Sequence, residues 1–255
     1  MIVCKSQGEI ERMRIANALV ADVLAELGSM VAPGVTTGDL DAEAERLVRE
    51  RGAEPAFKGY RGYPATLCAS VNEQVVHGIP SARKLVNGDI VSLDMGVKLN
   101  GFFGDSAITV PVGEVSEDVL RLLQVTHEAL DKGIEQVHVG GRISDIGHAI
   151  QHHVEAHGFS VVREFVGHGI GASLHEEPQI ANYGEPGRGP RLAEGMVLAI
   201  EPMVNMGRPA VKVLADGWTA VTRDGSLSAH FEHTVAVMKD GPLVLTSRTS
   251  PAAVR

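Results

Sequence analysis

Apolar residues recur at helical spacing in four stretches of the chain. Over residues 9–28 they appear every three or four positions, the pattern of a helix with one buried face, and Gly28 is the expected end. Further helices are predicted over residues 39–51, 117–136 and 144–157. Gly52 and Gly158 follow the second and the fourth of these stretches, and glycine is a common residue just beyond a helix end.

Short apolar runs bounded by glycine, asparagine and proline lie between and after the helices and predict β-strands. They cover residues 90–95, 102–111, 196–200, 211–214 and 234–238. No Ser/Pro-rich linker or low-complexity tract interrupts the sequence. The pattern therefore predicts a single α+β domain over residues 1–255.

A faint internal repeat relates the first part of the chain to the second. The predicted helices at residues 39–51 and 144–157 align at an offset of 106. At an offset of 107, LVNGDIVSLD, which ends at Asp94, matches LAEGMVLAIE, which ends at Glu201. A later match aligns GDSAITV with FEHTVAV. The shared order of helices and acidic strands predicts two structurally similar halves.

The acidic residues of these strands are expected to converge. An Asn-Gly pair at positions 100 and 101 predicts a two-residue hairpin turn, which places Asp94 opposite Ala107 and Gly96 opposite Asp105. The two aspartates are then diagonal neighbours on one face, about 7–8 Å apart at Cα. Packing the two halves together would bring Glu201 and Glu232 into the same cluster.

Four converging carboxylates require compensation. At about 4 Å and an effective dielectric near 20, each like-charged pair costs about 4 kcal/mol. One shared proton would not relieve four carboxylates, whereas two divalent cations balance their charge. His168, which has a glycine on either side in VGHGIG, is the expected nitrogen ligand. A two-metal site is therefore favoured over a carboxylate acid–base pair.

Composition narrows the class of protein. The net charge of -9 and the pI of about 5.6 disfavour nucleic acid and anionic membranes as partners. Cys4 and Cys68 form no C-x-x-C pair, so neither a disulfide framework nor a thiolate zinc site is predicted. The charged N-terminal stretch lacks the apolar core of a signal peptide, and no apolar run approaches the roughly 20 residues of a membrane span. A cytoplasmic protein is expected.

Several motifs together resemble the type 1 methionine aminopeptidases, a branch of the pita-bread metallopeptidases. They are HGIP at residues 77–80, GHGIG at 167–171, HEEP at 175–178, IEPMV at 200–204 and EHT at 232–234, with Asp94 and Asp105 eleven positions apart. Only 31 positions separate Glu201 from Glu232, which leaves no room for the helical insert of the type 2 enzymes. The resemblance implies a pita-bread α+β fold, with two pseudo-symmetric halves and a curved antiparallel β-sheet covered by helices.

The resemblance also implies a role for each ligand. Asp94 would bind one ion, Asp105 and Glu232 would bridge two ions, and His168 and Glu201 would complete the second. Glu201 would also shuttle a proton. His77 and His175 would contact the scissile amide and the tetrahedral intermediate. The implied cofactors are two divalent ions drawn from Co, Mn, Fe or Zn, since carboxylate and imidazole ligands accept all four.

The implied reaction is removal of the initiator methionine from nascent proteins and peptides, preferably before a small second residue. The matching pocket positions are Phe57, Tyr60, Tyr63, Cys68, His77, Leu174, His175 and Trp218. Phe57 and Leu174 depart from the family, whose members often carry Cys and Phe there. The expected partners are an N-terminal methionine peptide and, transiently, the ribosome, and the expected state is a monomer. His230 receives no role.

Two alternatives stay open from the sequence. One is a proline-directed aminopeptidase or prolidase of the same fold, and the other is a non-enzymatic pita-bread binding protein. HAIQHHVEAH, over residues 148–157, contains two histidine pairs at i, i+4, but its glutamate is misplaced for H-E-x-x-H. A solvated helix face is predicted for this segment. GHGIGAS, over residues 167–173, fails the dinucleotide-binding pattern.

Overall fold

Helices and strands alternate through residues 1–247, the part of the chain that the computed structural model describes. The helices are α1 (Gln7–Met30), α2 (Thr37–Glu50), α3 (Glu117–Ile134) and α4 (Ile143–Ala156), with the 3-10 turn η1 (Tyr60–Gly62). The strands of the first half are β1 (Glu54–Pro55), β2 (Cys68–Val71), β3 (Gln74–Val76), β4 (Ile90–Leu99) and β5 (Phe102–Pro111). Those of the second half are β6 (Ser160–Val161), β7 (Gly167–Gly169), β8 (Glu176–Ile180), β9 (Val197–Ile200), β10 (Met203–Asn205), β11 (Val211–Val213), β12 (Ala220–Thr222), β13 (Ser228–His230), β14 (His233–Met238) and β15 (Gly241–Val244). The last positions of the predicted domain, residues 248–255, lie outside the described residues.

The four predicted helices are present, and their ends follow local chemistry. Thr36 caps α2, because its hydroxyl accepts a hydrogen bond from the Asp39 N–H at 3.0 Å and the Asp39 carboxylate accepts one from the Thr36 N–H at 3.0 Å. Gly52 and Gly158 lie just beyond α2 and α4 with φ of 73° and 81°. The predicted stop at Gly28 was wrong, since α1 continues to Met30. Gly28 lies within the helix and faces β5, where a Cβ would make an ordinary contact with the Ile108 side chain at 3.4 Å.

The hairpin of β4 and β5 has the predicted register. Asp94 pairs with Ala107, and Gly96 pairs with Asp105. The turn residues Asn100 and Gly101 have φ of 52° and 82°, as a two-residue hairpin turn requires at both central positions. The five predicted strand runs are all present, although β4 extends four residues further than predicted, to Leu99.

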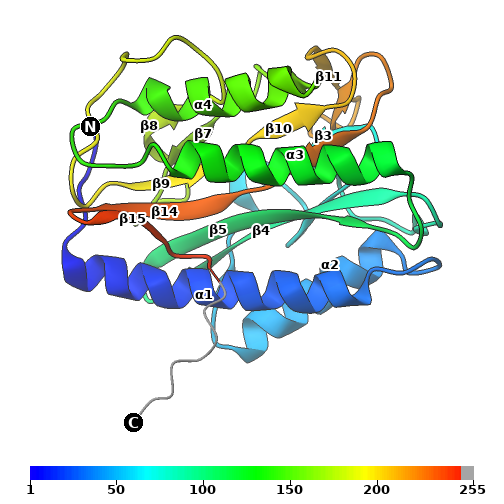
Figure 1. Cartoon of the computed structure of the whole chain (residues 1–255). Coiled ribbons are helices and arrows are strands. Elements are labelled where there is room, and N and C mark those ends of the chain that lie inside the picture. Colours follow the sequence, from blue (N-terminus) through cyan, green and yellow to red (C-terminus); the bar gives the residue numbers. More distant parts are fainter. Residues whose placement is uncertain (248–255) are drawn as a thin grey trace.

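The chain forms two similar halves, each with a pair of helices and antiparallel strands (Figure 1). Residues 37–50 of α2 and 143–156 of α4 differ by the predicted offset of 106. In one half β4 lies between β2 and β5, and in the other β9 lies between β7 and β14. The halves meet where Ala107 on β5 forms an antiparallel bridge with Glu232, just before β14.

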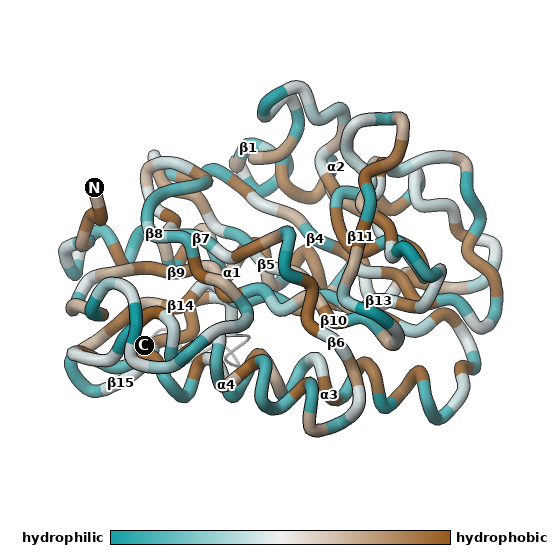
Figure 2. Tube along the Cα trace, turned by 90° about the horizontal axis from the view of Figure 1, so that it is seen from above, coloured by the Kyte–Doolittle hydropathy of each residue, from teal (hydrophilic) through white to brown (hydrophobic). Residues whose placement is uncertain are grey.

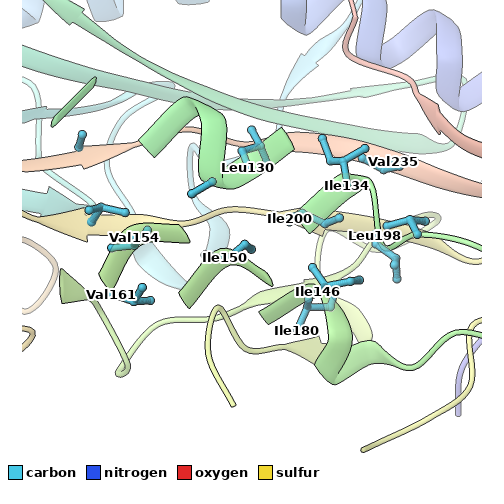
Figure 3. Packing of buried hydrophobic residues seen from close by; sticks show 14 of the residues in the cluster. Leu130, Ile134, Ile146, Ile150, Val154, Val161, Ile180, Leu198, Ile200 and Val235 are labelled. Carbon is cyan, nitrogen blue, oxygen red and sulfur yellow. The ribbon is translucent and has the colours of Figure 1, made fainter. Parts of the chain in front are cut away.

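A mainly aliphatic core lies in each half. One cluster packs α1 and α2 against β2 and β4, and the other packs α3 and α4 against β9 and β14. In the second cluster Leu130, Ile150, Leu198 and Val235 come together from two helices and two strands (Figure 3). Burying one such side chain completely stabilises the folded state by about 1.5–3 kcal/mol relative to leaving it exposed. Hydrophobic and hydrophilic residues alternate along α3, as expected from a helix with one buried face (Figure 2).

Within residues 1–247, no helix is both long enough and apolar enough to cross a membrane.

Candidate functional site

The five predicted metal ligands come from both halves and line one pocket. Asp94 lies on β4 and Asp105 on β5, while His168 lies on β7. Glu201 directly follows β9, and Glu232 directly precedes β14. Because β7, β9 and β14 are neighbours and β14 meets β5, these positions face one another across the junction of the halves.

Backbone contacts hold Asp105 and Glu232 close together. The Glu232 N–H donates to the Ala107 carbonyl at 2.9 Å, and the Ser106 hydroxyl donates to the Glu232 carbonyl at 2.7 Å. The Thr234 hydroxyl donates to the Asp105 carbonyl at 2.8 Å. The relative position of the two carboxylates is therefore fixed by main-chain geometry as well as by side-chain packing.

Helix α1 supports Asp105 from behind. A Cβ on Gly104 would lie 3.0 Å from the backbone of Ala16, so only glycine permits this close approach of helix and strand. The neighbouring Asn17 is fully buried, and its side-chain oxygen accepts a hydrogen bond from the Asp105 N–H at 3.2 Å. Its amide donates to the Met13 carbonyl at 2.9 Å, which fixes its orientation.

The His168 ring presents one nitrogen to the carboxylates. Its Nδ1 lies 2.9 Å from the Gly169 carbonyl oxygen, which only accepts, so Nδ1 carries the proton. Its Nε2 lies 3.8 Å from Asp105 Oδ2 and 3.7 Å from Glu201 Oε1. Burial, with a smaller contribution from His175, lowers the pKa of His168 to about 4. The ring is therefore neutral near pH 7, with the Nε2 lone pair free to bind a metal.

The carboxyl cluster is electrostatically costly without a cation. Burial raises the pKa of Asp94 to about 7. Burial is also the main cause that raises the pKa of Asp105, Glu201 and Glu232 well above their usual range, and the neighbouring carboxylates add to it. Ligand atoms of Asp105, His168 and Glu232 all lie within 4.8 Å of one another. This is the arrangement expected of a metal site.

Two further histidines flank the cluster. The His175 ring lies 4.2 Å from that of His168 and stacks on Tyr60, whose hydroxyl is 2.9 Å from His175 Nδ1. The His77 ring packs edge-on against Trp218 at 6.2 Å. Burial lowers the pKa of both histidines, to about 4 for His77, and a smaller effect comes from His175 on His77 and from Arg61 on His175. Each ring can therefore donate one hydrogen bond and accept another.

All the predicted substrate-binding positions line the same pocket. They are Phe57, Tyr60, Tyr63, Cys68, His77, Leu174, His175 and Trp218. The pocket volume is about 160 Å³, several times the share of one water in the liquid, which is about 30 Å³. The space is thus suited to a side chain of moderate size, with apolar and aromatic walls on one side and the carboxylates on the other.

Sequence reasoning missed Arg61 and left His230 without a role. Arg61 lines the pocket and places its guanidinium 5.4 Å from the centre of the Tyr60 ring. The sequence offered one indication of its role, since Arg61 directly follows the predicted pocket residue Tyr60. His230 is buried, and its Nε2 lies 3.7 Å from Glu201 Oε2. His230 lies two residues before Glu232, so strand alternation predicts that it faces the same side as that residue. Alternation does not predict that the His230 ring also approaches Glu201.

Comparisons with known proteins cover nearly the whole chain. The profile of metallopeptidase family M24 matches residues 11–239. Methionine aminopeptidase 1 of Bacillus subtilis is 55% identical over 246 residues, which are 96% of this chain and 99% of that protein. The crystal structure of methionine aminopeptidase from Rickettsia prowazekii matches with a TM-score of 0.96 at 44% identity, over 97% of this chain and 100% of that chain.

Proline-directed enzymes are more distant. Prolidase from Pyrococcus horikoshii matches with a TM-score of 0.79 at 23% identity, over 98% of this chain but only 65% of that chain. At this identity the likeness shows a common fold alone. The first alternative from the sequence is therefore supported only as a shared architecture.

Proposed function

The chain belongs to metallopeptidase family M24, and on this premise we propose that its pocket removes methionine from the N-terminus of peptides and nascent proteins with the help of two divalent ions. Its relatives are metal-dependent aminopeptidases, which sets aside a non-enzymatic binding protein. The observation that carries the proposal is the meeting of four carboxylates and one neutral imidazole at the wall of a partly apolar pocket.

The residues fit a pair of divalent ions. Asp94 Oδ1, Asp105 Oδ1 and Glu232 Oε1 are buried, and within residues 1–247 none has a hydrogen-bond partner. Buried polar atoms are normally satisfied, so these oxygens are available as ligands. Four negative charges match two divalent cations. Oxygen ligands with one imidazole suit Mn, Fe, Co or Zn, and the choice among them depends on availability.

We assign the ligands as follows. Asp94 would hold one ion, His168 and Glu201 would hold the other, and Asp105 and Glu232 would serve both. Bound divalent ions would supply Lewis acidity and would lower the pKa of a water molecule to near neutrality. The position of Asp105 and Glu232 at the junction of the halves supports this shared role.

The remaining chemistry belongs to side chains at the wall of the pocket. Glu201 lies at the wall of the pocket beside His168, and its carboxyl would hold and release a proton during turnover. His175 and His77 are neutral near pH 7 and would hydrogen-bond the scissile amide and the developing oxyanion. Tyr60, 2.9 Å from His175 Nδ1, orients that ring.

The apolar side of the pocket suits a methionine side chain. Phe57, Tyr63 and Trp218 supply aromatic surface, and a thioether packs favourably against aromatic rings. The Tyr63 hydroxyl lies 3.0 Å from the Gly78 carbonyl, so its polar end is satisfied away from the substrate. Leu174 closes the pocket beside His175. A small second residue of the substrate is part of the proposal and rests on the family resemblance.

The oligomeric state, the cellular location and the contact with the ribosome are also proposed. We expect a monomeric enzyme in the cytoplasm that acts on nascent chains during transient contact with the ribosome. Co-sedimentation with translating ribosomes and light scattering of the purified protein would test these expectations.

The deciding experiment measures hydrolysis by protein stripped of metal with a chelator. Added Mn(II) or Co(II) should restore release of methionine from Met-Ala-Ser, and Ala-Pro should remain intact. Elemental analysis of the reconstituted protein should find at least two ions per chain. Cleavage of Ala-Pro without methionine release would favour the proline-directed alternative, and full activity in the stripped protein would refute the metal-dependent mechanism.

A further inference from the structure

A second group of potential metal ligands lies between α3 and α4, where the two helices run side by side (Figure 1). It consists of Glu128 on α3, His153 on α4 and His157 at the end of α4, and one ligand atom of each lies within 4.8 Å of the others. None of the three lines the substrate pocket. The proposed aminopeptidase reaction does not use them.

Local geometry turns the two histidines toward one point. Residues four apart lie on the same face of a helix, and the rings of His153 and His157 are 4.5 Å apart. His157 Nδ1 lies 2.7 Å from the His153 carbonyl oxygen, so Nδ1 carries the proton and Nε2 is left with its lone pair. One imidazole is therefore already fixed in the tautomer that a metal requires.

The carboxylate comes from the neighbouring helix and is also held in place. Glu128 Oε2 lies 3.1 Å from His153 Nε2, and the Gln124 amide donates to Glu128 Oε1 at 2.7 Å. A histidine–glutamate pair alone would explain the contact with His153. It does not explain the second ring beside the first, which brings one ring nitrogen of His157 within 4.8 Å of ligand atoms of both His153 and Glu128.

The same helix contains a comparison pair that lacks these features. His148 and His152 are also four residues apart, but their rings are 6.3 Å from each other. Within residues 1–247 they belong to no group of three potential ligands. The helical spacing of histidines is thus common to both pairs, and they differ in the closer approach of the His153 and His157 rings and in the carboxylate of α3 beside them.

We propose that Glu128, His153 and His157 form a surface site for one zinc-class transition-metal ion, which joins α3 to α4. Two imidazoles and one carboxylate are an established Zn²⁺ ligand set, with a fourth position left for water. The side chains of His153 and Glu128 are 16% and 40% exposed, so they can shift to the roughly 2.0–2.2 Å that zinc requires. The sequence predicts a solvated helix face here, and the proposal adds a metal ion to that partly exposed surface.

The test counts zinc ions per chain by elemental analysis after equilibrium dialysis of untagged protein against buffered Zn²⁺. The wild type is compared with His157→Ala and with the matched control His152→Ala, an exposed histidine on the same helix. His157→Ala should retain one ion fewer than the wild type, and His152→Ala should retain the same number. Equal zinc contents in all three proteins, or a loss in His152→Ala alone, would overturn the proposal.

The difference between these variants does not depend on the substrate pocket. If the pocket bound no zinc, all three totals would fall equally and the difference of one ion would remain. Glu128→Gln provides a second variant, because it keeps the shape of the side chain and removes its charge, and its zinc affinity at this site should fall at least about tenfold. Methionine release should be unchanged in Glu128→Gln and His157→Ala. An unchanged affinity in Glu128→Gln would exclude the carboxylate as a ligand.

Discussion

The backbones of Ala107 and Glu232 are joined by a 2.9 Å hydrogen bond from the Glu232 N–H to the Ala107 carbonyl. Ala107 is also the hairpin partner of Asp94. One residue of β5 therefore fixes the position of Asp94 in the first half relative to Glu232 in the second. The candidate centre is therefore assembled at the joint between the halves. This relationship sets the first two predictions.

Replacing Glu232, the proposed shared ligand of the two ions, should abolish function. Glu232→Gln is expected to lower kcat/KM by more than about 100-fold, because changes even one step behind a metal ligand cost 10–100-fold. It should also lower the metal content at the pocket. In chelator the variant should melt at a higher temperature than the wild type, since one of four repelling charges is gone. Calorimetry and elemental analysis check both points, and full activity in this variant would contradict the two-metal assignment.

Removing the Ser106 hydroxyl, where the two halves meet, should have a smaller effect on metal binding than replacing Glu232. Ser106→Ala removes the 2.7 Å hydrogen bond to the Glu232 carbonyl but leaves every ligand in place. We expect metal affinity to fall about tenfold, at the lower end of the effect of groups that support ligands. Isothermal titration with Mn(II) measures this. Ser92→Ala, which removes a hydroxyl pair with Thr109 elsewhere on the same hairpin, is the control and should leave affinity unchanged.

His230 should support Glu201. Its Nε2 is 3.7 Å from Glu201 Oε2, and it is buried behind the ligand cluster. His230→Leu fills similar space without a polar group and should lower metal affinity about 10–100-fold. His230→Gln, which can still donate a hydrogen bond, should recover part of the loss. Equal affinities in the two variants would show that packing alone accounts for this residue.

The contact between Tyr60 and His175 should affect turnover more than metal binding. Tyr60→Phe keeps the stacked ring but removes the hydroxyl 2.9 Å from His175 Nδ1. A lost hydrogen bond of about 1 kcal/mol corresponds to a several-fold decrease in kcat. His175→Ala should reduce kcat much further with unchanged metal content. Steady-state kinetics with Met-Ala-Ser, paired with elemental analysis, separates these effects.

Acid should destabilise the protein through His77. Burial lowers the pKa of His77 to about 4, below its unfolded value near 6.5. The neutral ring therefore contributes stability that is fully present above pH ~6.5 and is lost as the pH falls toward 4. His77→Asn tolerates the positive φ of 60° at this position and lacks the titration.

The measurement for His77 is urea unfolding in chelator between pH 7.5 and 4.5. The free energy of unfolding of the wild type relative to His77→Asn should decrease across this range. His152→Asn, at an exposed position, is the control and should show a nearly constant difference. A difference that stays constant for His77→Asn as well would mean that the ring is not buried as neutral imidazole.

Sequence alone determined the four helices, five of the described strands and, except for Arg61, the residues that line the candidate pocket. The helical spacing of apolar residues and the residues at the helix ends located the helices. Thr36 caps the start of α2 and Gly52 follows its end, and both effects depend only on neighbouring residues. The Asn-Gly turn fixed the register that puts Asp94 opposite Ala107, because a two-residue hairpin leaves one pairing. The internal repeat at an offset of 107 relates Asp94 to Glu201 from the sequence alone. These inferences depend on local geometry, which the sequence encodes directly.

Tertiary structure decided what depends on distant approach. Gly28 does not end α1, and it lies inside the helix where α1 packs against Ile108 of β5. Arg61 reaches the pocket and His230 reaches Glu201 through the packing of separate elements. Likewise, two histidine pairs on α4 are equivalent by spacing, and the tertiary structure distinguishes them by the separation of their rings and by the position of Glu128 on the neighbouring helix. Spacing along one element fixes which side chains share a face, whereas the packing of elements fixes what that face meets.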